Sequence, residues 1–395
     1  MNLNNARSNA NSNIGFRPAL SIARSYPAMA VYPVHCKKDV FDMAGCQNIE
    51  QSGRCAGSDL FSQIVDFENL YKAAYRARKG KRNRHEVAEF FFNLDENLIQ
   101  LQNELLWGSY QTGVYHNFYV YEPKKRLVAA LPFRDRVVQH SIVAAIEPIF
   151  EKRFIYDSYA CRVGKGTHAG ADRAQRFLRD VQRRCGKIYA LKADISKYFA
   201  SIDRETLKKL ISQKISCKKT LSLISAIIDS SPGENGIPIG NLTSQLCANI
   251  YLHELDWYAK HTLSIKRYIR YMDDFVVVHH DKRQLHQWRA DIERFLLNYL
   301  RLKTNHKTQV FPVAVKNGRA LDFLGYRIYP THRLLRKCSI KRIKTKIKKY
   351  KRQIKTGELS ITDAGRKLQS WIGHASHCNS YGLRKALLSK KMEIS

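Results

Sequence analysis

The sequence predicts an α+β fold in which amphipathic helices surround a small number of short antiparallel strands. Two patterns support this class. Apolar residues recur at intervals of three and four over long stretches from residue 60 onward, and short alternating runs adjoin tight turns. With 395 residues, 44% of them hydrophobic, the chain can bury two or three cores, which excludes disorder throughout.

The charge balance indicates the class of partner. The chain carries 68 Lys and Arg against 34 Asp and Glu, a formal net charge of +34. This excess favours a polyanion, and nucleic acid is favoured over a membrane because no apolar run approaches the roughly 20 residues of a membrane span. Nine Cys without a CxxC pair are typical of reduced thiols. We therefore expect a cytoplasmic protein with no membrane partner.

The first 59 residues differ from the rest of the chain. Six Asn stand within residues 1–13 and little periodicity follows, so residues 1–59 are interpreted as an extension. Beyond it, Pro123 and the two Lys that follow predict a hairpin with a basic tip. The elements expected in this half are helices over residues 60–74, 87–106 and 134–150, a further helix ending near 184, and strands over 110–121 and 127–131.

The second half places carboxylates at the ends of strands. Residues 187–195 alternate as a strand, with Lys192 and Asp194 on the same face. Two short strands, 269–271 and 275–278, flank Met272-Asp273-Asp274 and predict a tight hairpin turn. The other expected elements are helices over 204–228, from 241 past 257, over 289–302 and over 340–354, with a strand over 322–328.

The adjacent acids Asp273 and Asp274 are unusual in so basic a chain. Their like charges repel unless a cation or solvent relieves them. Such a turn on its own is usually solvated, but here Asp194 ends another predicted strand. Three carboxylates could hold two Mg²⁺ ions, which align an attacking hydroxyl with a triphosphate. Nucleotide transfer is therefore the leading hypothesis.

Five sequence blocks occur in the order found in reverse transcriptases, which the chain resembles over about residues 60–388. The blocks are residues 194–199 (DISKYF), 236–245 (GIPIGNLTSQ), 271–274 (YMDD), 305–308 (NHKT) and 323–326 (FLGY). Upstream, the fingers blocks of group II intron-type enzymes are similar to residues 126–128 (RLV), 133–139 (FRDRVVQ) and 158–162 (SYACR). Each block alone is a weak signal, but their order is specific.

The resemblance implies a right-hand polymerase with fingers, an antiparallel-sheet palm and a short helical thumb. Residues 60–193 are then expected to be mainly fingers, and residues 194–330 mainly palm with a fingers-side helical insertion at about 204–236. Residues 331–395 would be the thumb, in which residues 333–355 hold 12 basic residues and no acid. The implied reaction is RNA-directed DNA synthesis from deoxynucleoside triphosphates (dNTPs), with an RNA/DNA hybrid held in the enzyme.

The resemblance also implies roles for particular side chains. Asp194, Asp273 and Asp274 match the metal-binding triad, for two Mg²⁺ with Mn²⁺ as a substitute, and Lys307 matches the cation that protonates leaving pyrophosphate. The implied nucleotide-binding residues are Lys125, Arg126, Phe199, Ile239 and Gly240, where the Phe199 ring would exclude a 2′-hydroxyl. The implied template and primer contacts are Arg162, Gln245, Tyr271, Gly325, Arg336, Lys337, Lys341, Lys344 and Lys348. Without the motifs, Phe199 is as readily a core aromatic and the cations are surface residues.

Two positions depart from most reverse transcriptases. Ile239 stands where most have Gln, and Ser244-Gln245 where most have Ser-Pro. Because an aliphatic side chain cannot hydrogen-bond the nascent pair, selection should loosen. These features resemble diversity-generating retroelement reverse transcriptases, as do residues 166–170 (GTHAG) and 334–337 (LLRK). That resemblance implies adenine mutagenesis of a target gene from a template-repeat RNA, an oligomeric accessory variability determinant protein, and a bacterial or phage source.

Two alternatives remain open for the function. A group II intron-like or defence-associated reverse transcriptase would share the three carboxylates, with Ile239 a neutral difference. A non-catalytic nucleic-acid-binding relic of a polymerase would keep the fold alone.

The Asn-rich start has its own interpretation. It resembles the translated end of a template repeat, which predicts a later start codon, for instance Met29 or Met43. The alternative is a disordered tail.

Two Cys and His groups are set aside as metal sites because their spacing or surroundings do not fit one. They are His35 with Cys36, Cys46 and Cys55, and residues 374–378 (HASHC).

Overall fold

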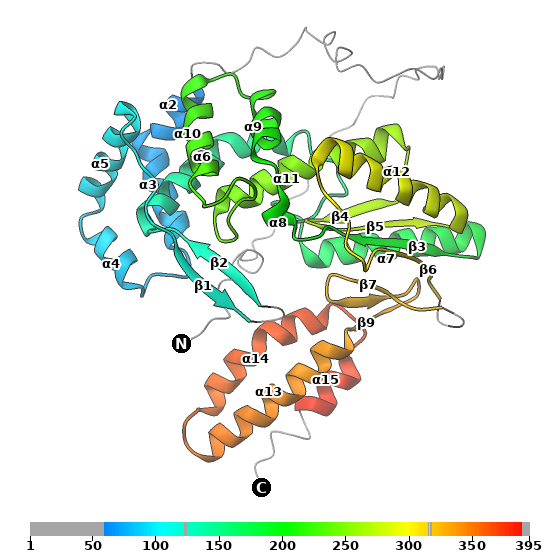
Figure 1. The fold of residues 1–395 in the computed structure, drawn as a ribbon. Helices are drawn as coiled ribbons and strands as arrows, with labels where there is room; N and C mark the ends of the chain where they lie inside the picture. Colours follow the sequence, from blue (N-terminus) through cyan, green and yellow to red (C-terminus); the bar gives the residue numbers. More distant parts are fainter. Residues whose placement is uncertain (1–58, 122–124, 315, 317, 389–395) are drawn as a thin grey trace, which may run out of the picture.

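The structure is a computed structural model that describes residues 59–121, 125–314, 316 and 318–388, and these form an α+β arrangement with antiparallel sheets (Figure 1). The α+β class predicted from the sequence is confirmed. The predicted extension and its Cys and His residues lie outside the described residues, apart from Asp59. In the described part of the chain, no helix is long and apolar enough to cross a membrane.

A body of helices forms one side of the molecule, at the left of Figure 1. Its centre is α6 (Phe133–Glu151), which packs against α3 and α11 and contributes Val138 and Ile142 to the buried core. The other helices of this body are α2 (Asp59–Val65), α3 (Phe67–Arg78), α4 (His85–Phe92), α5 (Leu94–Trp107), α9 (Arg204–Ser212), α10 (Lys218–Asp229) and α11 (Leu242–Trp257), which the π-helix η2 (Tyr258–Thr262) continues.

The helix predicted over residues 87–106 is wrong as a single element, because it divides at Asn93 into α4 and α5. The backbone of Asn93, with φ −117° and ψ 53°, leaves the helical region. The side-chain amide of Asn97 donates to the carbonyl oxygen of Phe90 at 3.0 Å, so a carbonyl at the end of α4 keeps a partner. The break therefore costs little hydrogen bonding.

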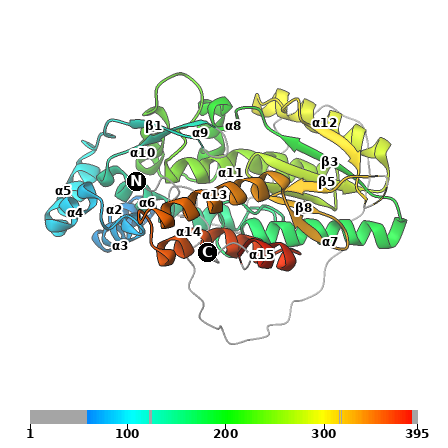
Figure 2. The ribbon, with the colours of Figure 1, turned by 90° about the horizontal axis from the view of Figure 1, so that it is seen from below.

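A four-stranded antiparallel sheet in the order β4-β5-β3-β6 lies on the other side of the molecule. Its strands are β3 (Tyr189–Asp194), β4 (Tyr268–Tyr271), β5 (Asp274–His279) and β6 (Gln309–Pro312). Alternating side chains face opposite layers: Leu191 and Val277 join the core that contains α12 (Lys282–Leu300), whereas Ala190 and Val276 join the core that contains α7 (Thr167–Cys185). The view in Figure 2 shows the sheet between these two helices.

A second, three-stranded sheet follows, with strands β7 (Leu321–Phe323), β8 (Tyr326–Ile328) and β9 (Arg333–Leu335). The single strand predicted over residues 322–328 is wrong, because Leu324 and Gly325 form a hairpin turn within it. Both residues have left-handed backbones, with φ 52° and 87°, which is the geometry of a two-residue turn between twisted strands.

Three helices complete the chain: α13 (Lys337–Lys355), α14 (Ile361–Ser376) and α15 (Tyr381–Leu388). They pack through a small core of Ile343, Ile347, Leu368 and Leu387. The basic helix predicted over residues 340–354 is confirmed as α13. Its apolar stripe faces this core, and its Lys and Arg side chains occupy the rest of its surface.

Candidate active site

A cleft of about 3410 Å³ lies between the helical body, the four-stranded sheet and α13. The β1–β2 hairpin, formed by β1 (His116–Val120) and β2 (Arg126–Ala130), borders it, as does the short helix α8 (Tyr198–Ser201). Most of the site residues predicted from the sequence line this one cleft. They are Lys125, Arg126, Asp194, Phe199, Ile239, Gly240, Gln245, Tyr271, Asp273, Asp274, Lys307 and Arg336.

The strand pairing brings the three aspartates together. Asp194, at the end of β3, is the register partner of Asp274, at the start of β5. Asp273 precedes Asp274 in the turn, and its carbonyl oxygen accepts from the backbone N–H of Ile195 at 3.2 Å. The turn is tight because Met272 adopts a left-handed backbone with φ 55°. The sheet therefore presents three carboxylates at one edge of the cleft.

Asp194 is held by the segment that follows α12. The backbone N–H of Asn305 donates to the carbonyl oxygen of Asp194 at 2.6 Å, and the amide Nδ2 of Asn305 lies 3.4 Å from Oδ2 of Asp194. An isolated bridge between Ile195 and Thr304 runs beside these contacts. The 305–308 block is thus placed next to the aspartates, and Lys307 lines the same cleft.

Asp274 lies in an environment that penalises its charge. Burial raises the pKa of Asp274 to about 7, the nearby Lys192 ammonium opposes this rise, and the charges of Asp194 and Asp273 add to it. Lys192 Nζ lies 3.5 Å from Oδ2 of Asp274. The second oxygen, Oδ1, is buried and has no hydrogen-bond partner among the described residues. A carboxylate oxygen in this state is stabilised when a cation binds it.

The donor set fits a hard divalent cation. Carboxylate oxygens are the ligands that Mg²⁺ and Mn²⁺ prefer, and Asp274 offers a buried oxygen with no other partner among the described residues. The side chains are not arranged as a closed metal cage, since the described residues contain no group of three His, Cys, Asp or Glu side chains close enough to hold an ion.

The loop at Ile239 and Gly240 contacts the β1–β2 hairpin closely. The backbone N–H of Ala129 donates to the carbonyl oxygen of Ile239 at 2.9 Å. Gly240 has φ +136°, and a Cβ there would lie 2.4 Å from the carbonyl oxygen of Ala129. Only glycine permits both this backbone and this approach. The hairpin that carries Lys125 and Arg126 is therefore fixed against the loop that carries Ile239.

Phe199 stands on α8, directly after the strand that carries Asp194. Its ring contacts Tyr198 in an edge-on arrangement with centroids 5.6 Å apart, and its carbonyl oxygen accepts from the N–H of Ile237 at 2.8 Å. The ring is partly buried against the core and also lines the cleft. The ring therefore packs on the core and is also open to the cleft, and its contact with the sugar of a dNTP stays a prediction.

The structure does not bring every predicted contact into the cleft. The Arg162 side chain is only 6% exposed and pairs with Glu151 at 2.7 Å, and its Nη1 donates to the carbonyl oxygens of Ile155 and Ser158. Gly325 instead packs under His374, whose ring would lie 3.0 Å from a Cβ at that position. The remaining predicted contacts outside the cleft lining are Lys337, Lys341, Lys344 and Lys348, all exposed on α13.

Several cleft residues were missed by the sequence reasoning. The α13 side chains that line the cleft are Lys346 and Lys349. Lys192 carried a usable signal, because it shares the strand face of Asp194. The other missed basic residues in the lining are Arg78, Lys79, Lys81, Arg82, Arg84, Arg136, Lys197, Arg319 and Arg327. The cleft therefore combines a carboxylate edge with a basic wall, and the basic wall favours binding of a polyanion such as nucleic acid.

The comparison with known families agrees with this class of site. The family described as "Reverse transcriptase (RNA-dependent DNA polymerase)" matches residues 121–328, which is more than half of the chain. The chain belongs to this family, and the enzyme class predicted from the sequence is confirmed. The family implies the right-hand polymerase fold.

Two bacterial proteins are similar to parts of this chain. Protein YkfC of Escherichia coli is 28% identical over 60% of this chain and 71% of its own length. The group II intron-encoded protein LtrA of Lactococcus lactis is 29% identical over 49% of this chain, which corresponds to 32% of LtrA. The chain therefore spans most of YkfC and about a third of LtrA. Among solved structures, apo telomerase from Candida tropicalis aligns with a TM-score of 0.44 and 13% identity, over 59% of each chain.

Proposed function

We propose that this protein copies a template-repeat RNA into cDNA with errors at template adenines, for the diversification of a target gene. The observation that carries the polymerase part is the pairing of Asp194 with Asp274 at the edge of a basic cleft. In this proposal the four-stranded sheet belongs to the palm, the β1–β2 hairpin and the helices before it to the fingers, and α13–α15 to the thumb.

The site residues predicted from the sequence have separate chemical tasks in this proposal. Asp194, Asp273 and Asp274 would hold two Mg²⁺ or Mn²⁺ ions, which supply electrostatic stabilisation to the entering and leaving oxygens when bound. Lys125 and Arg126, on the hairpin, would bind the triphosphate of the dNTP. The ring of Phe199 would lie against the sugar and exclude a 2′-hydroxyl.

Lys307 would donate a proton to pyrophosphate as it leaves. Its place beside Asn305, which contacts Asp194, supports this role. The basic residues of the wall would bind the phosphates of the RNA/DNA hybrid. Among them, Arg336 also pairs with Asp322, which fixes its side chain at the start of α13.

Ile239 supports the error-prone part of the proposal. Its side chain borders the cleft without a hydrogen-bonding group, and its carbonyl oxygen is already used by Ala129. Selection of the incoming base would then rest on shape and stacking, which discriminate less than a hydrogen bond does. Recognition of the template RNA would rest on shape and backbone, with an oligomeric accessory protein as a further partner.

A second candidate is a group II intron-like reverse transcriptase. The similarity to LtrA favours it. Both candidates share the chemistry and differ in accuracy opposite template adenine.

Primer extension on an RNA template with Mg²⁺ tests the enzyme. We expect DNA synthesis that Asp273→Asn abolishes and that Asp95→Asn, on the exposed face of α5, leaves unchanged. Activity that survives Asp273→Asn would refute the assigned site. No synthesis by the folded wild-type chain on any primed RNA would favour a non-catalytic relic.

Sequencing of the products separates the two candidates. Frequent misincorporation opposite adenine alone, reduced by Ile239→Gln, is the expected result for a diversity-generating enzyme. Uniform accuracy across the four template bases would favour the group II intron-like function. The flanking DNA gives an independent check, because the proposal requires a pair of near-identical repeats that differ at adenines.

A further inference from the structure

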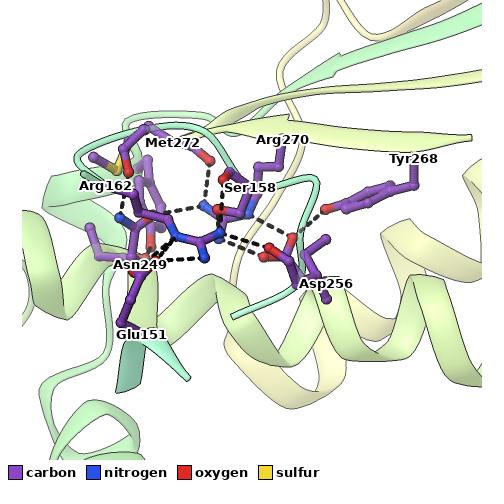
Figure 3. A network of polar contacts seen from close by, with 12 residues as sticks. Glu151, Ser158, Arg162, Asn249, Asp256, Tyr268, Arg270 and Met272 are labelled. Atoms are coloured by element: carbon purple, nitrogen blue, oxygen red, sulfur yellow. Dashed lines mark hydrogen bonds and ion pairs between the residues drawn. The ribbon is translucent and has the colours of Figure 1, made fainter. Parts of the chain in front are cut away.

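A buried polar network reaches the carbonyl oxygen of Met272, the residue that precedes Asp273 in the turn (Figure 3). At its centre, Arg270 on β4 and Asp256 on α11 are both fully buried. They form a bidentate pair, with Arg270 Nε 2.7 Å from Oδ1 and Nη2 2.6 Å from Oδ2 of Asp256. Burial alone would lower the pKa of Arg270, but the charge and hydrogen bonds of Asp256 raise that pKa above its ordinary value.

Every N–H of the Arg270 guanidinium has a partner. Nη2 also donates to Oγ of Ser158 at 3.2 Å, and Nη1 donates to Oδ1 of Asn249 at 3.2 Å. The second Nη1 proton is directed to the carbonyl oxygen of Met272, at 3.1 Å. A guanidinium has five N–H groups, so all of its donors are used. One of them binds the backbone of the turn.

Met272 is the residue of the turn that needs this support. Its left-handed backbone, with φ 55°, is uncommon for a side chain that carries a Cβ and is retained only where the surroundings enforce it. The carbonyl that accepts from Arg270 belongs to the peptide group that joins Met272 to Asp273. The orientation of this peptide group determines where the Asp273 carboxylate points and how β5 begins at Asp274.

The network is also anchored away from the turn. Tyr268 donates its hydroxyl to Oδ1 of Asp256 at 2.8 Å, and Asn249 donates to the carbonyl oxygen of Ala160 at 2.8 Å. The Tyr268 hydroxyl is an outer contact, because Asp256 keeps its bidentate pair with Arg270 without it. A buried charged pair adds little net stability over well-packed apolar residues. Here its bidentate geometry holds the guanidinium in one orientation.

We propose that Arg270 is a positioning residue for polymerisation. Through the Met272 carbonyl it holds the turn so that Asp273 and Asp274 face Asp194, and Asp256 holds Arg270 in place. This inference rests on the proposed role of the three aspartates as metal ligands. Arg270 itself is fully buried and does not line the cleft, so we expect it to act through the turn.

Arg270→Lys tests the proposal, with Tyr268→Phe as the matched control. Lysine keeps a positive charge opposite Asp256 but is a single point that cannot also reach the Met272 carbonyl. Tyr268→Phe removes a hydrogen bond of the same network on the side away from the turn. We expect Arg270→Lys to lower kcat by about 10–100-fold, as loss of support behind a metal ligand typically does. KM for dNTP and Kd for template–primer should stay unchanged.

Direct Mn²⁺ binding, followed by electron paramagnetic resonance on the complex with a dideoxy-terminated primer, supplies a readout independent of turnover. We expect affinity for Mn²⁺ to fall about 10-fold or more in Arg270→Lys and to stay unchanged in Tyr268→Phe. A wild-type kcat and Mn²⁺ affinity in folded Arg270→Lys would overturn the proposal. Equal losses in Tyr268→Phe, at a similar loss of melting temperature, would also overturn it and assign Arg270 to stability alone.

A second variant keeps the test decisive if Arg270→Lys does not fold. The pair Arg270→Met with Asp256→Leu replaces both buried charges by apolar side chains, an exchange that proteins tolerate well. The same fall in kcat and in Mn²⁺ affinity is expected, and wild-type values would overturn the proposal. Failure of the assigned site itself is recognised separately, because Asp273→Asn would then retain activity.

Discussion

Lys192 Nζ lies 3.5 Å from Oδ2 of Asp274, across the pairing of β3 with β5. Two residues along β3, Asp194 faces the same side of the sheet. A lysine therefore neutralises part of the carboxylate charge at the place where divalent cations are proposed to bind. The Lys192 ammonium would therefore compete with an incoming metal ion for the carboxylate of Asp274.

Replacement of this lysine should change the metal requirement. Lys192→Met removes a positive charge close to the carboxylates, so we expect half-maximal primer extension at a Mg²⁺ concentration about three- to ten-fold lower. Lys192→Arg is the control and should keep the wild-type requirement. Titration of activity with Mg²⁺ measures the effect, and a higher requirement in Lys192→Met would contradict this account.

Gly240 is expected to be intolerant of a side chain. Alanine there would place Cβ against the carbonyl oxygen of Ala129 at an impossible 2.4 Å, on a backbone with φ +136°. We expect Gly240→Ala to cost about 1–3 kcal/mol in the free energy of unfolding and to raise KM for dNTP, because the hairpin must move.

Gly365 provides the comparison for that variant. It lies inside α14, and no atom of another element comes within 4 Å of the position that a Cβ would take there. Gly365→Ala should therefore stabilise the fold by about 0.5–1 kcal/mol and leave KM unchanged. Chemical denaturation and steady-state kinetics on both proteins measure the difference. A Gly240→Ala enzyme with wild-type KM would show that the hairpin contact is not needed.

The two sides of α13 should differ in nucleic-acid binding. Lys346 and Lys349 line the cleft, whereas Lys344 and Lys348 do not. Each phosphate contact adds about 0.9 to the slope of log K against log salt, so Lys346→Ala with Lys349→Ala should lower that slope by about 1–2. Lys344→Ala with Lys348→Ala should change it little. A larger fall of the slope in Lys344→Ala with Lys348→Ala would instead support the face of α13 that was predicted from the sequence.

The free energy of unfolding should fall in mild acid because of a half-buried histidine, His168, beside the second sheet. Burial, with smaller contributions from His377 and His374, lowers the pKa of His168 to about 4 from its ordinary 6.5. Between these values the unfolded chain binds the proton and the folded chain does not. The stabilising contribution is thus complete above pH 6.5 and is lost as the pH falls toward 4.

Thermal unfolding between pH 7.5 and 5 measures this effect. We expect a falling melting temperature in the wild type and a flatter profile in His168→Gln, which cannot take up a proton. His85, whose side chain is 95% exposed, supplies the control variant His85→Gln. A profile in His168→Gln as steep as that of the wild type would assign the acid sensitivity to other groups.

Part of the site was predictable because a hairpin turn and the alternation along a strand are local in sequence, whereas the pairing of β3 with β5 joins distant segments. Asp273 and Asp274 had to share a turn, and the alternation of residues 187–195 placed Asp194 and Lys192 on one face. The direction in which α13 turns its lysines was not predictable. Periodicity shows that Ile343 and Ile347 face inward, but both flanks of that stripe are equally basic, and only the docking of the helix selects Lys346 and Lys349.

Burial of charged side chains was the other limit. Arg162 looked like a nucleic-acid contact because nothing in a sequence shows that Glu151, on the preceding helix, will enclose it. Arg270 stood beside the strongest motif of the chain and drew no attention, since its partner Asp256 comes from a helix separated by a π-helix and a loop. Such pairs depend on how distant elements pack, and the periodicity of apolar residues in the sequence does not predict that packing.

The enclosed pair has a consequence for how this sequence can evolve. Loss of either Arg270 or Asp256 alone leaves an opposite charge unpaired in the interior at a cost of about 3–5 kcal/mol, a large part of a typical protein's stability, whereas loss of both together spares the stability of the fold and removes only the support of the Met272 carbonyl. Single replacements at these positions are therefore dead ends for a diverging lineage. The two positions should therefore covary among homologues. A homologue with an apolar residue at one position should carry an apolar residue at the other.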